Sequence, residues 1–206
     1  MRVVGFSGYS GSGKTTLVEQ LIARLRLAGQ RVSVVKHAHH DFDIDHPGKD
    51  SHRLREAGAF EVVIASDRRL AKIREFEVRA DPTVHQLIAE LYDSLDDKLW
   101  VLVEGFKHAD VLKIEVWRAE TGKPVQYPQD PYVVAISTDS PERLPEPTGL
   151  PLLDLNDPDA VIHFLLADPN RYEYRSPLDL VAPEPAADAH AGRSAGPDAS
   201  RDPSAG

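Results

Sequence analysis

The sequence predicts an α/β fold in which helices cover both faces of a mainly parallel β-sheet. The first observation behind this prediction is a series of short, β-branched apolar runs, which are typical of strands buried on both faces. The second is that amphipathic stretches separate several of these runs, and strand and helix in alternation favour parallel strands joined by helical crossovers. The runs lie at residues 3–6, 32–35, 62–65, 100–103 and 133–136.

Three helices are predicted from their apolar faces and their end signals. Residues 15–28 carry apolar side chains on one face and are followed by Gly29, which favours the left-handed conformation that ends a helix. An Asp-Pro pair precedes each of the other two helices, with Asp expected as the N-cap and Pro at the first helical position. These pairs are Asp81-Pro82, before residues 83–95, and Asp157-Pro158, before residues 159–166.

Two further runs, residues 71–78 and 111–117, alternate apolar and polar side chains. This is the pattern of a strand with one exposed face, so we expect both to be antiparallel or edge strands. Thr121-Gly122 is expected to turn the chain after the second run.

Composition predicts one folded domain at residues 1–168. Residues 182–206 contain no Leu, Ile, Val, Met, Phe, Tyr or Trp, so they cannot bury enough apolar surface to offset the entropy of ordering, and we expect a disordered Pro/Ala-rich tail. Residues 169–181 are a transitional segment, because their tyrosines and aliphatic side chains can dock on the body while Pro169 and Pro177 interrupt regular structure.

Charge and residue usage exclude several classes of protein. The 206 residues carry a formal charge of −9, and a negative surface argues against nucleic-acid binding. The absence of Cys excludes a disulfide scaffold and a thiolate zinc site. Since no membrane span or secretory leader is recognisable, we expect a cytoplasmic protein with a small-molecule or protein partner.

Residues 8–15 match the phosphate-binding pattern G-x-x-x-x-G-K-[ST] between the first predicted strand and the first predicted helix, as a P-loop requires. Its glycines let backbone N–H groups turn toward phosphate oxygens, beside the partial positive charge of the helix N-terminus. Lys14 would reach the β- and γ-phosphates, and the Thr15 hydroxyl would bind Mg²⁺. The alternative is a Gly-rich turn with an incidental lysine. The predicted phosphate-binding residues are Gly8, Ser10, Gly11, Ser12, Gly13, Lys14, Thr15 and Thr16.

A carboxylate, Glu104, follows the buried run at residues 100–103. Because Mg²⁺ prefers oxygen ligands and usually takes one carboxylate from the protein, we predict that Glu104 binds the metal or orients water. Gly105 behind it allows a close approach of the backbone. Glu104 and Lys14 are thus the candidate catalytic residues. The alternative is a surface glutamate at a strand end.

A dense group of His and Asp follows the second predicted strand, at residues 37–46. Such a group suggests a transition-metal site. A loop that senses Mg²⁺ and phosphate explains the same residues without a second metal, because strand ends beside a P-loop face the nucleotide. A solvated charged loop is the third possibility. Lys49, Arg53 and Arg55 then offer a phosphate contact or an arginine in cis, although an exposed helix face is favoured for the two arginines.

These motifs together resemble the MobB family, the molybdopterin-guanine dinucleotide biosynthesis adapter proteins, over about residues 1–166. The resemblance rests on residues 8–16, on residues 35–51, and on Leu-Val-Glu-Gly-Phe-Lys at 102–107; the middle feature is the most specific. The resemblance implies a P-loop NTPase-type fold similar to that of dethiobiotin synthetase. It also implies a homodimer that binds GTP, hydrolyses it weakly, and assists a partner, the molybdenum-cofactor guanylyltransferase, in attaching GMP to molybdopterin.

The resemblance also assigns roles by position. Residues 11–16 become contacts of the GTP phosphates, residues 41–51 become a nucleotide-sensing loop, and Thr15, Glu104 and Asp41 become candidate Mg²⁺ groups. Further nucleotide contacts are implied at His37, Asp43, Lys49, Asp50 and Lys107. The half-exposed strand at 111–117 is the candidate dimer contact, since an unpaired edge invites a second chain. Direct binding of molybdopterin stays open.

Guanine specificity has no recognisable motif in this chain, because no Asn/Thr-Lys-x-Asp segment occurs in it. The polar segment after the run at 133–136 lies where an α/β sheet binds ligands. Asp139 is our candidate, since a carboxylate accepts two hydrogen bonds from N1–H and the exocyclic amine of guanine. Ordinary turn chemistry at Asp139-Ser140-Pro141 is the alternative.

Three functions therefore compete. The leading one is a GTP-binding accessory protein of molybdenum-cofactor guanylylation with slow hydrolysis of a phosphoanhydride. The second is a small-molecule kinase or ATP-dependent ligase of the dethiobiotin-synthetase-like class. The third is a module that holds a nucleotide without hydrolysing it. Turnover separates them: the accessory protein would hydrolyse slowly and respond to its partner, the kinase or ligase would turn over rapidly only with its acceptor, and the module would not hydrolyse the nucleotide.

Overall fold

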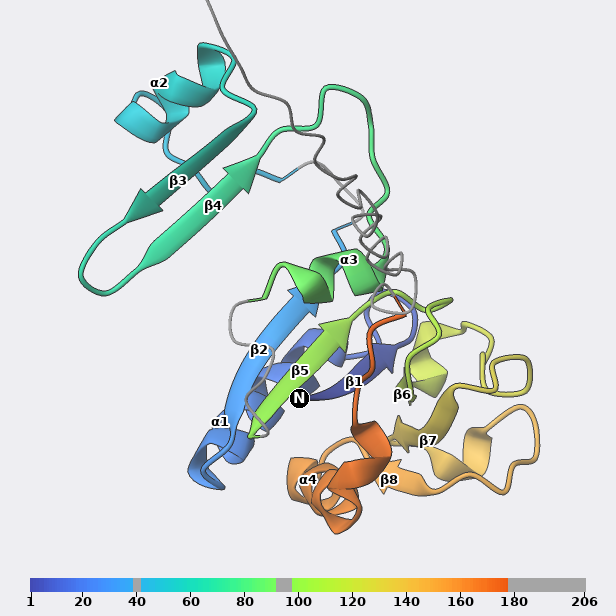
Figure 1. The fold of residues 1–206 in the computed structure, drawn as a ribbon. Helices are drawn as coiled ribbons and strands as arrows, with labels where there is room; N and C mark the ends of the chain where they lie inside the picture. Colours follow the sequence, from blue (N-terminus) through green and yellow to red (C-terminus); the bar gives the residue numbers. More distant parts are fainter. Residues whose placement is uncertain (39–41, 92–97, 178–206) are drawn as a thin grey trace, which may run out of the picture. The chain divides into compact units, whose positions relative to one another are not determined.

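The computed structural model describes residues 1–38, 42–91 and 98–177 (Figure 1). By its contacts the chain divides into two units, Met1–Arg175 and Ser176–Gly206. All the elements below belong to the first unit. The predicted tail at 182–206 lies outside the described residues, and so does Asp41. Within the described residues, no helix combines the length and the apolar character needed to cross a membrane.

The main sheet has six parallel strands in the order β2-β5-β1-β6-β7-β8. Figure 1 shows β2, β5 and β1 side by side, with their carboxyl ends at one edge. This confirms the predicted α/β class with a mainly parallel sheet. The strands are β1 (Arg2–Ser7), β2 (Arg31–Lys36), β5 (Leu99–Glu104), β6 (Lys113–Trp117), β7 (Val133–Thr138) and β8 (Leu152–Asp154).

Helices cover both faces of this sheet, because successive strand residues point to opposite faces. Val4 and Trp100 pack in a core with α1 (Lys14–Leu27) and α4 (Pro158–Ala167). Val3 and Val101 pack in a second core with α3 (Val84–Ala89). The transitional segment contributes to both cores: Tyr172, in the 3-10 helix η3 (Pro169–Tyr172), is buried in the first, and Tyr174 packs against the second.

The helix ends agree with the sequence for α1 and α4 but not for α3. Gly29 follows α1 with a φ of 74°, and Asp157 caps α4 with its side chain. The N-cap of α3, however, is Thr83 instead of Asp81. The Thr83 hydroxyl accepts from the Gln86 N–H, and the Gln86 side chain accepts from the Thr83 N–H. This reciprocal pair, a capping box, favours Thr83 over Asp81 as the N-cap. The helix ends at Ala89, before residue 95.

The strand β6 differs most from its prediction. It is not an edge strand: it pairs in parallel with β1 and β7, and all five of its residues are buried. Its polar residues made it look half-exposed, but each is paired inside the protein. The Lys113 ammonium donates to the carbonyls of Lys107 and Ala109 and to Asp130, and the Glu115 carboxylate accepts from the N–H groups of Gln126 and Tyr127. A dimer contact at β6 is therefore excluded.

A second, antiparallel sheet holds β3 (Glu61–Ala65) and β4 (Leu70–Arg74), and α2 (Asp50–Glu56) precedes it. The antiparallel prediction is confirmed for β4. The prediction that the run at 62–65 is buried on both faces is wrong, because four of the five residues of β3 are exposed. Ion pairs of Lys72 and Arg74 with Glu90 join β4 to the end of α3.

Candidate nucleotide-binding site

The loop between β1 and α1 has the backbone conformation of a phosphate cradle. Gly8, Gly11 and Gly13 have φ values of 135°, 83° and 94°, a region that L-residues rarely adopt. At Gly8 there is also no room for a side chain, because a Cβ would lie 2.3 Å from the Val116 carbonyl oxygen. No side chain caps α1 at Gly13, so its first-turn N–H groups remain available to an anion.

Two polar side chains of this loop are notable: Lys14 lines the cavity, while Ser12 is buried beneath the loop and does not line it. The Lys14 ammonium folds back and donates to the Tyr9 carbonyl at 2.7 Å. Burial lowers the pKa of Lys14, and nearby Lys36 adds to this effect, while Glu104 acts to raise it. The Ser12 hydroxyl is 1% exposed and has no hydrogen-bond partner among the described residues. The Lys14 ammonium can donate to phosphate oxygens, the strong acceptors that charge-assisted hydrogen bonds favour, and a phosphate role for Ser12 stays a prediction.

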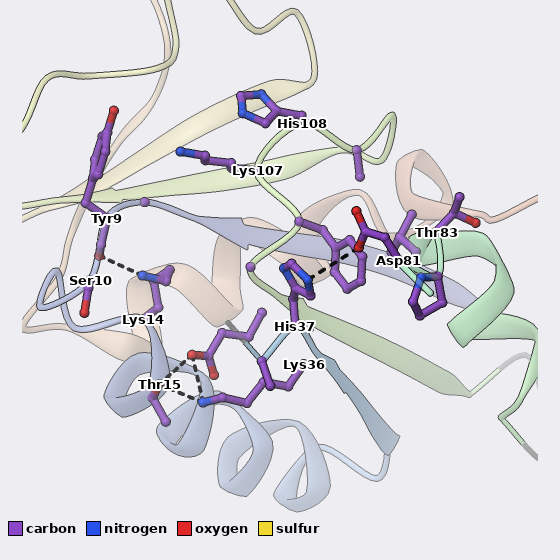
Figure 2. A pocket seen from close by; sticks show the side chains of 18 of the residues that line it. Tyr9, Ser10, Lys14, Thr15, Lys36, His37, Asp81, Thr83, Lys107 and His108 are labelled. Atoms are coloured by element: carbon purple, nitrogen blue, oxygen red, sulfur yellow. Dashed lines mark hydrogen bonds and ion pairs between the residues drawn. The ribbon is translucent and has the colours of Figure 1, made fainter. Parts of the chain in front are cut away.

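Glu104 meets the P-loop because β5 lies between β1 and β2. The parallel register places Glu104 opposite Phe6 on one side and opposite Lys36 on the other. Its carboxylate accepts from the Thr15 hydroxyl at 2.6 Å and from the Lys36 ammonium at 3.1 Å (Figure 2). The sequence reasoning assigned no role to Lys36. The signal that could have found it is its position at the end of the strand that follows the P-loop helix.

The donor set at Thr15 and Glu104 fits Mg²⁺. A hydroxyl and a carboxylate in direct contact supply the one or two protein oxygens that Mg²⁺ takes when substrate phosphates and water complete its shell. No cluster of three or more His, Cys, Asp or Glu suited to a metal occurs in the described part of the chain. The alternative of a transition-metal site in the His/Asp segment depends on His39, His40 and Asp41, which lie outside that part and leave the alternative open.

His37 and Lys107 line the same cavity as the P-loop, as the resemblance implies. The ring of His37 lies 4.8 Å from that of Phe106, and its Nε2 lies 3.8 Å from the Asp81 carboxylate. The Lys107 ammonium lies 5.0 Å from the centre of the Tyr9 ring, within reach of a cation–π interaction. The chain bends sharply before it: Gly105 has a φ of 92° and Phe106 a φ of 47°.

The cavity has a volume of about 1230 Å³. This exceeds the range of about 300–1,000 Å³ that is usual for small-molecule sites. Beyond the P-loop it continues along residues 81–85 and 105–110. His85 in this wall is hydrogen-bonded on both ring nitrogens, to the Tyr174 hydroxyl and the Asp110 carboxylate, each at 2.7 Å. The hydrogen bond from His85 is the main cause that lowers the pKa of Asp110.

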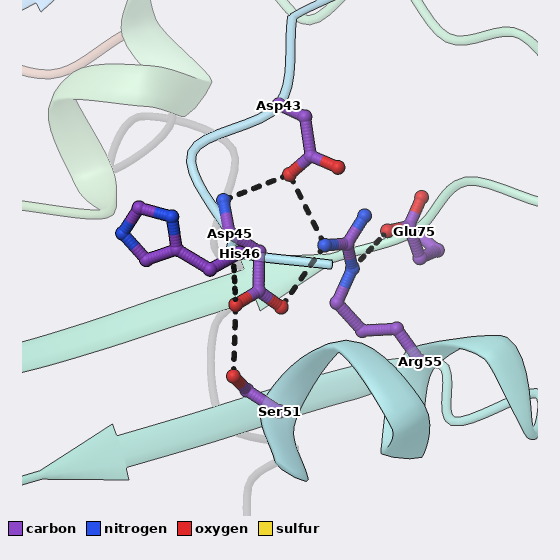
Figure 3. A network of polar contacts seen from close by, with 6 residues as sticks. All are labelled: Asp43, Asp45, His46, Ser51, Arg55 and Glu75. Atoms are coloured by element: carbon purple, nitrogen blue, oxygen red, sulfur yellow. Dashed lines mark hydrogen bonds and ion pairs between the residues drawn. The ribbon is translucent and has the colours of Figure 1, made fainter. Parts of the chain in front are cut away.

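Asp43, Lys49 and Asp50 do not line this cavity. Asp43 belongs instead to a polar network around Arg55 (Figure 3). The guanidinium of Arg55 lies 3.2 Å from Asp43, 3.1 Å from Asp45 and 2.7 Å from Glu75. The expected exposed helix face is correct for Arg53, whose side chain is 75% exposed, but wrong for Arg55, at 15%. A nucleotide-sensing role for Asp43, Lys49 and Asp50 stays a prediction.

Asp139 follows β7 as predicted, and its carboxylate already has partners. One oxygen lies 3.2 Å from Nε of Arg118, and the other accepts from the Ser140 hydroxyl at 2.9 Å. Arg118, the residue after β6, borders a second cavity of about 180 Å³. Sequence reasoning did not single out Arg118, because nothing near it in the chain points to the P-loop. The second cavity is lined by Gly13, Thr16, Leu17, Gln20, Arg118, Leu155 and Asn156.

Comparison with known proteins shows which family the chain resembles in sequence and in structure. A family model described as "Molybdopterin guanine dinucleotide synthesis protein B" matches residues 3–139. The molybdopterin-guanine dinucleotide biosynthesis adapter protein of Escherichia coli (strain K12) is 38% identical over 165 residues, 80% of this chain and 91% of the relative. That of Haemophilus influenzae is 43% identical over 155 residues, 75% and 82% of the two chains. The crystal structure of a MobB protein homolog from Bacillus stearothermophilus superposes with a TM-score of 0.60 at 26% identity, covering 83% of this chain and 99% of that one.

Proposed function

The chain belongs to the molybdopterin guanine dinucleotide synthesis protein B (MobB) family, and we propose from this membership that it is an adapter protein of molybdopterin guanine dinucleotide biosynthesis that binds GTP with Mg²⁺. The observation that carries the nucleotide part of the proposal is the P-loop cradle with Lys14 and the contact between Thr15 and Glu104. Its partner would be the guanylyltransferase that joins GMP to molybdopterin, in the cytoplasm.

In this proposal the triphosphate lies in the loop between β1 and α1. Backbone N–H groups and the N-terminus of α1 bind its oxygens, and the Lys14 ammonium exchanges the Tyr9 carbonyl for the β- and γ-phosphates. Mg²⁺ supplies neutralisation of charge on these phosphates, and Thr15 and Glu104 are the residues that would hold it. Lys36 keeps the Glu104 carboxylate turned toward Thr15.

Slow hydrolysis follows from how Glu104 is engaged. One carboxylate oxygen accepts from both Thr15 and Lys36, and in this proposal the carboxylate would also hold Mg²⁺, so it would not be free to take a proton from an attacking water. A site that binds the triphosphate tightly but activates water weakly suits an adapter whose nucleotide state is read by a partner. Turnover would then rise when the partner supplies a further group to the transition state.

The proposed homodimer needs a contact other than β6. We place it on the hairpin segment, residues 54–78, where large apolar side chains are exposed. An isolated pair of strands is marginally stable, and its outer edges have no partner strand among the described residues. A second copy related by a two-fold axis would cover the same patch on both chains. The exposed side chains are Leu54, Phe60, Val63, Ile64, Leu70, Phe76 and Val78.

One observation favours the second candidate, a small-molecule kinase or ligase. The large cavity continues past the P-loop along residues 81–85 and 105–110, where an acceptor would have room. Phosphate release from GTP and from ATP, each with and without the purified guanylyltransferase and molybdopterin, tests both functions. Slow GTP hydrolysis that responds to the partner supports the adapter. Rapid ATP turnover that requires an added acceptor would overturn it.

A further inference from the structure

The P-loop borders two cavities, the large one that holds the predicted phosphate site and the small one beside Arg118. Lys14, Thr15, Lys36 and Glu104 line the large cavity, so charge gathers on that side. Thr16 and Gly13 border the large cavity and also the small cavity of 180 Å³, which therefore begins where the phosphate cradle ends. The small cavity therefore adjoins the loop and can receive the other end of a nucleotide whose phosphates occupy it.

The walls of the small cavity suit a flat heterocycle. Leu17 and Leu155 are largely buried and form the apolar part of the wall, where only the edges of their side chains reach the cavity. Arg118 and Asn156 add polar groups that can read the edge of a ring. The walls thus combine apolar and polar groups in about equal parts, which suits a ligand with a flat body and a polar edge.

Arg118 forms an ion pair with Asp139 and lies beside the P-loop. Trp117 and Thr138 are register partners in β6 and β7, so the next residues, Arg118 and Asp139, leave the sheet together. The Asp139 carboxylate lies 3.2 Å from Nε of Arg118. The guanidinium also lies against the P-loop, because a Cβ placed on Gly13 would be 3.7 Å from its Nε and Nη2. A planar donor group fixed in this way is suited to recognition by paired hydrogen bonds.

We propose that the small cavity is the nucleobase site, and that Arg118, positioned by Asp139, reads O6 and N7 of a 6-oxopurine. Guanine presents two neighbouring acceptors there, which match the fork of a guanidinium. Adenine carries an amino group in place of O6, so a donor would face a donor. This inference rests on the proposed binding of a nucleoside triphosphate. It changes the role predicted for Asp139, whose carboxylate orients Arg118 and does not read N1–H and the 2-amino group itself.

The test compares four ligands, GTP, ITP, ATP and inorganic tripolyphosphate, by titration calorimetry with Mg²⁺. ITP keeps O6 and N7 but lacks the 2-amino group. With wild-type protein we expect ITP to bind as tightly as GTP, and ATP about tenfold or more weakly. Arg118→Gln is expected to remove the preference of GTP and ITP over ATP while affinity for tripolyphosphate stays within about twofold. Arg118→Lys, which keeps charge but loses the fork, is expected to give an intermediate preference.

Asp139→Asn separates positioning from direct reading. A positioning role predicts that this variant loses preference for GTP and ITP equally, and that combining it with Arg118→Gln adds no further loss. Arg143→Gln is the matched control, since Arg143 is an exposed arginine, 57% accessible, that pairs with Glu120. Melting curves of each variant establish that the fold is retained.

The outcomes distinguish this inference from the proposed function. If wild-type protein binds neither GTP nor tripolyphosphate, the proposed function fails and the base site fails with it. If it binds both, and Arg118→Gln leaves the ratio of GTP to ATP affinity unchanged, only the base site is overturned. Weaker binding of ITP than of GTP would also overturn it, because that result assigns the reading to the 2-amino group.

Discussion

The hydroxyl of Thr15 donates a 2.6 Å hydrogen bond to the carboxylate of Glu104, a residue 89 positions further along the chain. The contact exists because β5 lies between β1 and β2 and pairs with β1 in parallel. The P-loop follows β1 and Glu104 ends β5, so both lie at the carboxyl edge of the sheet. Two motifs that are unconnected in the sequence thus become one site.

Lys14→Ala is expected to weaken GTP binding by about 1.5–3 kcal/mol, roughly ten- to a hundredfold, because charge-assisted hydrogen bonds to phosphate are lost. The melting temperature should stay unchanged, since the ammonium donates its hydrogen bond to the Tyr9 carbonyl within the same loop and contributes little to packing. Titration with GTP measures the effect. Lys123→Ala is the control, because Lys123 is exposed and lines neither cavity. Equal affinity of wild type and Lys14→Ala would remove the P-loop assignment.

Glu104→Gln keeps the shape of the side chain and removes its charge. We expect a weaker dependence of GTP binding on Mg²⁺, with a smaller loss of affinity for GTP itself, because hard oxygen ligands with full charge bind Mg²⁺ best. The measurement is GTP affinity across a Mg²⁺ titration. Glu115→Gln is the comparison, as Glu115 is a buried glutamate at the centre of the neighbouring strand β6. An identical Mg²⁺ response in wild type and Glu104→Gln would leave Glu104 with a structural role.

The Arg55 network should make stability depend on pH on the acid side. Although burial acts to raise the pKa of Asp45, hydrogen bonds from Ser51, His46 and Arg55 lower it below its ordinary 3.8. A depressed carboxylate pKa stabilises the fold above pH 3.8, and this contribution is lost as the pH falls from 3.8 through the lowered value. Asp45→Asn is therefore expected to lower the melting temperature at pH 7 and to have little effect near pH 2.

Thermal unfolding at pH 7 and in steps down to pH 2 measures the difference. Asp67→Asn serves as the control, because the Asp67 side chain is 88% exposed. A constant gap between wild type and Asp45→Asn at all pH values would show that the Asp45 charge does not act through the network.

The dimer prediction concerns Val63 and Leu70, which project from the same face of the hairpin, since Ala65 pairs with Leu70 and Val63 with Lys72. Replacing both by Glu introduces charge into the proposed contact and should raise the dimer dissociation constant at least about tenfold. Sedimentation at micromolar concentration measures the association. Leu27→Glu, at an 88% exposed position on α1, is the control. A monomeric wild type, or a double variant that stays dimeric, would exclude this face.

The sequence predicts those parts of the site whose role is indicated by residues next to them in the chain. The Gly-rich loop stands between a β-branched run and an amphipathic helix, and Glu104 ends an apolar run, so both follow from neighbouring residues. Lys36 and Arg118 do not, because their partners Glu104 and Asp139 are set by which strands are neighbours in the sheet. Strand order is a property of the whole chain.

The strand β6 shows a second limit of sequence reasoning. Alternation of polar and apolar residues predicts an exposed face only if polar side chains seek water. Lys113 and Glu115 find protein partners instead, and burial raises the pKa of Glu115 against the hydrogen bonds from Gln126 and Tyr127. These partners lie at positions 107–109 and 126–130, and nothing in the run at 111–117 indicates them. The strand β3 shows the converse case: its residues are apolar, yet four of the five are exposed, so an apolar run does not by itself establish burial.

The glycines of the P-loop differ in which substitutions their surroundings allow. At Gly8 every other amino acid would place a Cβ 2.3 Å from the carbonyl oxygen of Val116, so a substitution there requires the loop or β6 to move. At Gly11 a Cβ would meet nothing within 4 Å, and the cost is the φ of 83° alone, which Asn and Asp tolerate best. The loop thus has one glycine, Gly8, that the neighbouring strand requires, and another, Gly11, at a position that the phosphate-binding pattern leaves open to any residue.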